Sequence, residues 1–166
     1  MAKDASFDVV SELNFQEVDN AWQQTLKELK QRYDLKDSGA TLDLDKQKHE
    51  FTLLAPSDFV ATQVKDVLGS KLVRREVDLK AVRWSAPAAA SGGMLRVTGA
   101  LVSGIDEDLI KKINKDIKAQ KFTKIKTQIE GEKLRVFSPS RDELQAVIAF
   151  LKDQDYGIPL QYVNYR

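Results

Sequence analysis

Apolar residues recur along the chain with two spacings, one typical of helices and one typical of strands. From residue 15 to 33 they fall three and four positions apart, which predicts a helix, and Asn14 with Glu17 resembles a capping box at its start. Alternation over 7–12 predicts a strand. The segments 41–45 and 49–54 predict a hairpin around a polar turn. A second helix follows Ser57, and a strand over 80–86 ends this half.

The second half of the chain repeats this order of elements. Strands are predicted over 94–101, 123–129, 133–137 and 158–165, with helices over 106–120 and after Ser140. The segment Phe51–Ser57 aligns with Leu134–Ser140 at an offset of 83 residues, half of the chain length of 166. Small residues, Gly and Pro form a linker over Pro87–Gly93. We therefore predict two domains, residues 1–88 and residues 89–166.

Each half has the order strand, helix, strand, strand, helix, strand. That order is typical of the ferredoxin-like α+β fold, a four-stranded antiparallel sheet with both helices on one face. The other face of each sheet is then left for solvent, a ligand or a partner.

Composition narrows the function classes. The chain has 42% hydrophobic and 31% charged residues, as in soluble globular proteins. It has no Cys, which excludes disulfides, thiolate metal sites and thiol nucleophiles, and its one His is His49. No apolar run approaches the ~18–20 residues that span a bilayer, so we expect no membrane partner. The N-terminal stretch lacks an apolar signal core, so we expect a cytoplasmic protein.

Positive charge is concentrated in one segment. Residues 111–135 contain nine Lys and Arg against Asp116, Glu130 and Glu132, a local net charge of +6 in a chain of net charge +1. Strand alternation places several of these cations on the uncovered face of the second sheet, with one aromatic ring. We expect this face to carry Arg96, Lys124, Lys126, Arg135 and Phe137.

These residue types suit a nucleotide or RNA. Lys and Arg bind phosphate, and an aromatic ring stacks a base. In this fold the first and third strands of a unit lie side by side at the centre of the sheet, so we expect Arg96 and Arg135 to be central neighbours, with Phe137 beside them. The alternative is a solvated charged face, and the paired aromatics of RNA-recognition domains are missing around residues 133–137. The first sheet's face would be neutral to acidic, with Asp43 and Glu50.

Other candidate sites have simpler explanations. Gly99–Gly104 lacks the Lys-Ser/Thr of a phosphate-binding loop. Asp43 and Asp45 could hold a divalent cation for phosphate hydrolysis, but acids that flank turns are commoner. His49 is expected to be a partly exposed strand residue. Trp22 and Trp84 are expected to pack in the core or between the domains, and Trp84 could also stack a base. We predict no catalytic residues, no metal site and no cofactor.

Several segments, in order, resemble the YajQ family of small bacterial nucleotide-binding proteins. The resemblance runs nearly from end to end. The segments that carry it are Ala5–Glu12, Ser57–Leu68, Lys71–Arg75, Ser103–Ile105, Gln128–Gly131, Leu134–Val136, Arg141–Val147 and Pro159–Arg166. Arg96, Lys124 and Arg135 match positions that tend to be basic in the family.

The resemblance implies two ferredoxin-like domains whose first strands are exchanged. It also implies a cytosolic, non-catalytic protein that binds GTP, ATP, cyclic di-GMP or RNA and acts on gene expression through transcription regulators. The alternative function is a protein-interaction adaptor for a transcription regulator, without a ligand of its own.

Overall fold

The computed structural model describes residues 4–166; residues 1–3, part of the N-terminal stretch considered above, lie outside the described residues. The described chain divides into two compact units, 13–102 and 4–12 with 103–166. The helices are α1 (Phe15–Gln31), α2 (Asp58–Arg74), α3 (Glu107–Ala119) and α4 (Arg141–Lys152). The strands are β1 (Ala5–Val10), β2 (Thr41–Asp45), β3 (Glu50–Ala55), β4 (Val82–Trp84), β5 (Ala88–Ala89), β6 (Leu95–Leu101), β7 (Lys126–Glu130), β8 (Lys133–Ser138) and β9 (Gln161–Val163).

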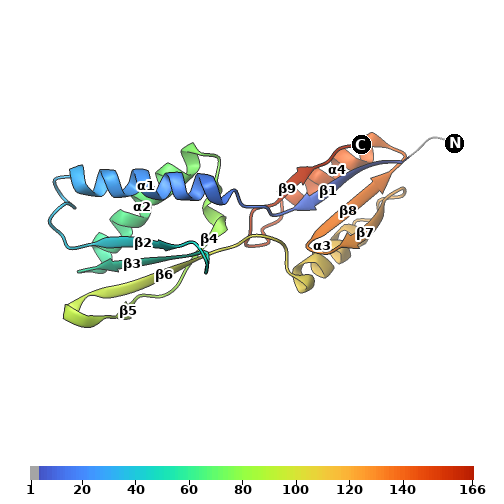
Figure 1. Cartoon of the computed structure of the whole chain (residues 1–166). Coiled ribbons are helices and arrows are strands. Elements are labelled where there is room, and N and C mark those ends of the chain that lie inside the picture. Colours follow the sequence, from blue (N-terminus) through green and yellow to red (C-terminus); the bar gives the residue numbers. More distant parts are fainter. Residues whose placement is uncertain (1–3) are drawn as a thin grey trace. The chain divides into compact units, whose positions relative to one another are not determined.

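The unit of residues 13–102 has an antiparallel sheet in the order β2-β3-β6-β4, and β5 also pairs with β6. Helices α1 and α2 cover one face of this sheet (Figure 1). Apolar residues of α1, α2 and the covered sheet face form one core, which includes Phe51, Leu53 and Leu68. Burial of this alternating face is the main stabilising contribution in the unit.

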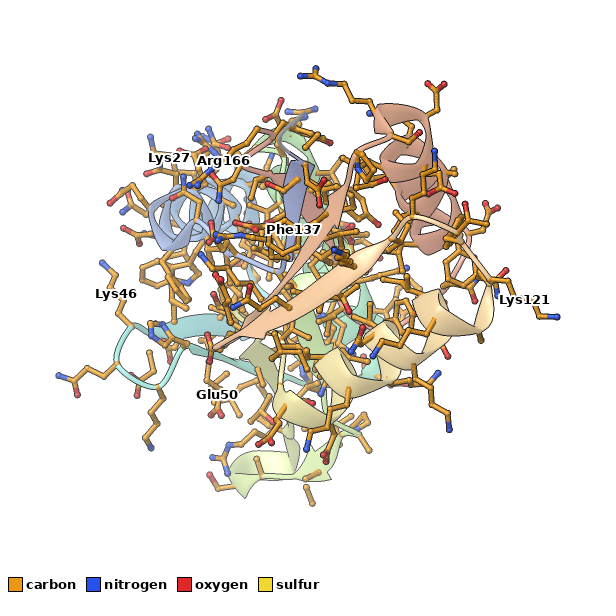
Figure 2. The ribbon with its side chains drawn as sticks, turned by 90° about the vertical axis from the view of Figure 1, so that its right-hand side faces the viewer. Lys27, Lys46, Glu50, Lys121, Phe137 and Arg166 are labelled. Atoms are coloured by element: carbon orange, nitrogen blue, oxygen red, sulfur yellow. The ribbon has the colours of Figure 1, made fainter. Side chains whose placement is uncertain are left out.

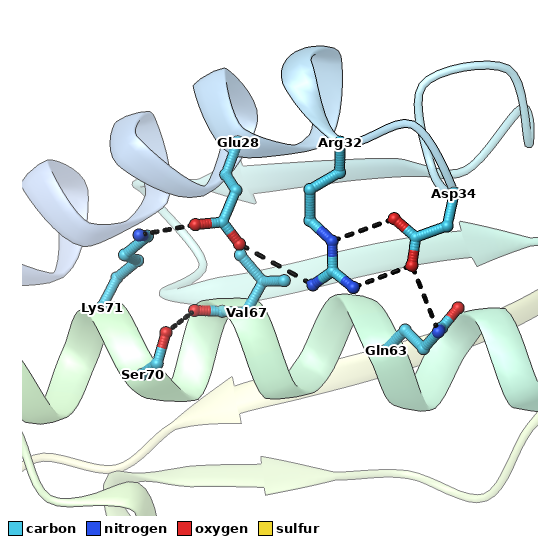
Figure 3. Close-up of polar contacts among 7 residues, drawn as sticks. All are labelled: Glu28, Arg32, Asp34, Gln63, Val67, Ser70 and Lys71. Atoms are coloured by element: carbon cyan, nitrogen blue, oxygen red, sulfur yellow. Dashed lines mark hydrogen bonds and ion pairs between the residues drawn. The ribbon is translucent and has the colours of Figure 1, made fainter.

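Polar contacts join α1 to α2 at the edge of this core (Figure 3). The Lys71 ammonium lies 2.9 Å from Glu28 Oε1, and the Arg32 guanidinium binds Asp34 with Nη2 2.8 Å from Oδ2. Gln63 donates to the same carboxylate at 3.5 Å. The Lys71–Glu28 pair joins the two helices directly, and Gln63 joins α2 to the turn that follows α1. These contacts add little stability, because most of them are at the surface.

The unit of residues 4–12 and 103–166 has an antiparallel sheet in the order β7-β8-β1-β9. Helices α3 and α4 lie on the same side of it (Figure 1). Their buried residues, such as Ile113 and Val147, lie on the side of the sheet that carries the buried residues Phe7 and Val136. The opposite sheet face is covered by no helix of this unit.

The α+β class and the order of the elements are confirmed by the structure. Two details differ from the expectation of two four-stranded sheets. One sheet has five strands, because Ala88 and Ala89 of the expected linker pair with Arg96 and Leu95 of β6. Pro87 lacks a backbone N–H, so the edge strand is interrupted before it continues as β5.

The strands also pair differently from the sequence halves. β1 pairs with β8 and β9, whereas β6 pairs with β3 and β4. The compact units therefore divide the chain elsewhere than between residues 88 and 89. The boundary at 88 describes the sequence repeat and stays a prediction.

Candidate functional site

The helix-free face of the β7-β8-β1-β9 sheet carries most of the residues singled out from the sequence. Opposed residues in antiparallel strands share a face, so the register fixes its composition. We call it the Phe137 face and define it by eight residues: Lys126, Gln128 and Glu130 of β7; Lys133, Arg135 and Phe137 of β8; and Ser6 and Asp8 of β1. It has three cations and two carboxylates, a net charge of +1.

Phe137 occupies the middle of three strands on this face. It is half-buried, and it is opposed by Lys126 on β7 and by Ser6 on β1 (its position on β8 is labelled in Figure 2). Within residues 4–166, the Lys126 ammonium has no ion-pair partner. A benzyl ring beside an unpaired ammonium is a suitable surface for a base and a phosphate.

Lys124 lies just before β7, in a loop that α4 holds in place. The Glu143 carboxylate accepts hydrogen bonds from the backbone N–H groups of Thr123 and Lys124 and from the Thr123 hydroxyl, at 2.9–3.2 Å. The Ser140 hydroxyl accepts from the Glu143 N–H, as the predicted cap requires. The Lys124 side chain is exposed at the end of the β7 edge.

Arg135 is bound by two carboxylates, neither of which was predicted from the sequence as its partner. Its Nε donates to Asp8 Oδ1 at 2.8 Å and its Nη2 to Oδ2 at 3.4 Å, while Nη1 donates to Glu130 Oε1 at 3.2 Å. Asn164 donates to Asp8 Oδ2 at 2.9 Å, and the Lys133 ammonium lies 3.9 Å from the same oxygen. Asp8 is only 1% exposed. A buried carboxylate needs such donors to remain ionised.

The two charges stabilise each other. Burial raises the pKa of Asp8, but hydrogen bonds from Arg135 and Asn164 and the nearby cations outweigh burial and leave that pKa below its usual value. The hydrogen bond to Asp8 raises the pKa of Arg135. Both groups are therefore charged at neutral pH, and the face presents a fixed guanidinium.

Arg96 does not join this face, so the prediction that Arg96 and Arg135 are central neighbours is wrong. Arg96 belongs to β6, where it is exposed and opposed by Leu54 of β3 and Ala88 of β5. The reason is that β6 pairs within the unit of residues 13–102, while β1 takes the place beside β8. Asp8 therefore occupies the position that was expected for Arg96.

The groove beside Trp84 is a second surface of interest. It encloses about 620 Å³ between α2 and the 79–84 segment, and its lining includes Val73, Leu79 and Trp84. Trp84 packs against the core, as expected, and the Lys65 ammonium lies 5.3 Å from its ring centroid. Val73 and Leu79 are 57% and 53% exposed. This groove is an exposed apolar surface, which single-strand alternation does not predict.

The remaining candidates have structural roles. His49 is exposed in the turn before β3, with a ring centroid 4.1 Å from that of Phe15. The Asp45 carboxylate accepts from the N–H groups of Gln47 and Lys48 and so closes the β2–β3 turn.

Within residues 4–166, no three His, Asp or Glu side chains are grouped so as to hold a metal ion. None of the helices over the same residues is long and apolar enough to cross a membrane.

Comparison with known proteins gives a consistent result. Residues 5–166 match the family model described as "Nucleotide-binding protein YajQ-like". Proteins named "Nucleotide-binding protein" from Desulfitobacterium hafniense and Enterococcus faecalis are 46% and 47% identical over 166 and 165 residues, 100% and 99% of each chain. One from Bacillus cereus is 45% identical over the full length of both chains. None of these names is that of an enzyme. The chain therefore belongs to the YajQ-like family of nucleotide-binding proteins.

Proposed function

We propose that this protein is a non-catalytic, cytoplasmic nucleotide-binding protein that acts in the regulation of gene expression. Its ligand is a purine nucleotide such as GTP or ATP, cyclic di-GMP, or RNA. The observation that supports this proposal is Phe137, half-buried at the middle of a helix-free sheet face and opposed by the unpaired Lys126. The names of the relatives point to the same class of ligand.

In this proposal, the Phe137 ring stacks a base, and Lys124, Lys126 and Arg135 bind phosphate. Arg96 stays a separate proposal as a phosphate partner on the other sheet. Stacking is worth about 1–3 kcal/mol per base, and each phosphate contact makes affinity depend on salt.

We also infer that the two sequence repeats, residues 1–88 and 89–166, are ferredoxin-like units that exchange their first strands. The pairing of β1 with β8 and of β6 with β3 supports this inference. The exchange brings Asp8 of the first repeat beside Arg135 of the second, so the Phe137 face requires both repeats.

The test is isothermal titration of the full chain with GTP, ATP, cyclic di-GMP and a short RNA at two salt concentrations. We expect Phe137→Ala to weaken binding about tenfold or more. We expect Lys126→Ala to weaken binding and to reduce the slope of log affinity against log salt concentration by about 1. The matched control is Lys118→Ala, which removes the same charge from the exposed side of α3. Arg96→Ala tests the separate proposal in the same titration. If the unaltered chain binds none of the four probes at low salt, the proposed function is wrong.

A protein-interaction adaptor for a transcription regulator is the competing candidate. The exposed apolar residues Val73 and Leu79 beside Trp84 favour it, because exposed apolar patches often contact partners. A regulator that still binds after all nucleotide is removed, and that is lost in Leu79→Glu, would support this candidate. The control is Lys80→Glu, which places a carboxylate on the neighbouring exposed residue and changes the net charge by two instead of one.

A further inference from the structure

The Arg135 guanidinium has two edges, and two different carboxylates use them. The Nε–Nη2 edge faces Asp8, and Nη1 donates to Glu130 Oε1 at 3.2 Å. We propose that Glu130 is an internal competitor for ligand phosphate: it holds Nη1 of Arg135 in the free protein and releases it when a nucleotide binds. This proposal rests on the proposed function and specifies how affinity at that site is set.

Asp8 is not the group that a ligand would displace. Its carboxylate is 1% exposed and is held by Arg135, Asn164 and Lys133. Removal of a partner from a buried carboxylate carries a large desolvation cost, so this pair persists in the complex. Asp8 is therefore a positioning residue, which fixes the direction in which the Arg135 guanidinium points.

Glu130 has the opposite character. It is the last residue of the edge strand β7, its side chain is 30% exposed, and Arg135 is the residue with which it forms an ion pair within residues 4–166. Gly131 follows it at a φ of +60°, in the turn to β8. A partly exposed ion pair at a strand end is weak, so a phosphate can replace the carboxylate on Nη1 at small cost.

The same geometry specifies how the ligand lies. Arg135 and Phe137 are two residues apart on one face of β8, a rise of about 7 Å along the strand. A nucleoside 5′-phosphate that stacks its base on Phe137 can place phosphate oxygens at the Nη1–Nη2 edge of Arg135. Lys133 lies on the same strand face two residues beyond Arg135, where it can contact a further phosphate group of the ligand.

The experiment compares Glu130→Gln with Glu132→Gln in the full chain. Both variants remove one negative charge from the β7–β8 turn region, but only Glu130 is bound to Arg135. The probe is GTP, titrated calorimetrically at low salt. We expect Glu130→Gln to bind GTP about three- to fivefold more tightly, because an ion pair no longer competes, and Glu132→Gln to bind like the unaltered chain.

A second measurement follows the carboxyl carbons of Glu130 and Glu132 by NMR. We expect the Glu130 signal to shift as GTP saturates the unaltered chain and the Glu132 signal to stay in place. If GTP binds but both variants have equal affinity and neither signal moves, this inference is wrong and the proposed function stands. If the unaltered chain binds none of GTP, ATP, cyclic di-GMP and RNA, both this inference and the proposed function are wrong.

Discussion

Asp8 and Arg135 are 127 residues apart in sequence, yet Nε of Arg135 lies 2.8 Å from Oδ1 of Asp8 across the β1–β8 pair. The contact joins a strand at the start of the chain to a strand near its end. It also explains why the face is less basic than the sequence suggests, because a buried carboxylate neutralises its central arginine.

Arg135→Ala is expected to lower the free energy of unfolding by about 2–4 kcal/mol, because Asp8 would remain buried with fewer donors. The double variant Asp8→Asn with Arg135→Ala should lose less than the sum of the two single losses, since it leaves no unpaired buried charge. Hydrogen exchange of the β1 and β8 amides is a suitable measurement, because Trp22 and Trp84 both lie in the other compact unit.

The control for this comparison is Arg83→Ala, at an exposed arginine of β4. It should change the free energy of unfolding by less than about 0.5 kcal/mol. Additive losses for Asp8 and Arg135 would show that the two side chains do not stabilise each other.

Asp8 also predicts a dependence of stability on pH. Its folded-state pKa is below the unfolded value of about 3.9, so its stabilising contribution is complete above that value and is lost as pH falls through the folded pKa. The difference in free energy of unfolding between the unaltered chain and Asp8→Asn should therefore be largest above pH ~5 and shrink towards pH ~2. Urea unfolding across this range measures it. A difference that stays constant would contradict the prediction.

The local pattern of apolar, polar and capping residues was sufficient to predict most of the helices and strands. The caps at Asn14, Ser57 and Ser140 and the periodic apolar residues placed the starts of α1, α2 and α4 within a few residues of those observed. The alternation over β8 also placed Arg135 and Phe137 on one face and Leu134 and Val136 on the other. Helix caps and strand alternation depend on residues that are close in sequence, so they can be predicted from a single sequence.

Strand partners were not predicted in the same way, because pairing depends on residues far apart in sequence. Arg96 was assigned to the sheet of its own half, although the family resemblance implied exchanged first strands. Applying the exchange to the alternation of β1 would have put Asp8, not Arg96, beside Arg135. Glu130 had no such signal, since which carboxylate reaches a guanidinium depends on side-chain conformation.

The strand pairing predicts how fragments of the chain behave. The fragment 13–102 contains all the strands of its sheet and both helices of its core, so it should fold alone. The fragment 1–88 lacks β6, which pairs with β3 over six residues, and should remain largely unfolded. Circular dichroism and amide NMR dispersion of the two fragments measure this. A cooperatively folded 1–88 fragment would show that β6 is dispensable and would refute the strand exchange.

Gly99 and Trp84 provide a test of packing on the covered face of the other sheet. Gly99 is buried on β6 and opposes Trp84 on β4, and a Cβ at Gly99 would lie 2.7 Å from Cζ3 of the indole and 2.9 Å from Cγ1 of Val82. Since that distance is too short for a carbon–carbon contact, the indole must move in Gly99→Ala. The movement would disturb its stacking with Phe51, whose ring centroid is 6.1 Å away.

We therefore expect Gly99→Ala to lower the free energy of unfolding by about 1–3 kcal/mol, the range for an overpacked core. Tryptophan fluorescence should report both effects, as a lower urea midpoint and as an emission shift of the native state. Ala100→Ser is the matched control, because residue 100 is exposed on the opposite face of the same strand. If Gly99→Ala leaves both the midpoint and the native emission unchanged, the indole does not rest on Gly99, and the wall of the Trp84 groove is arranged differently.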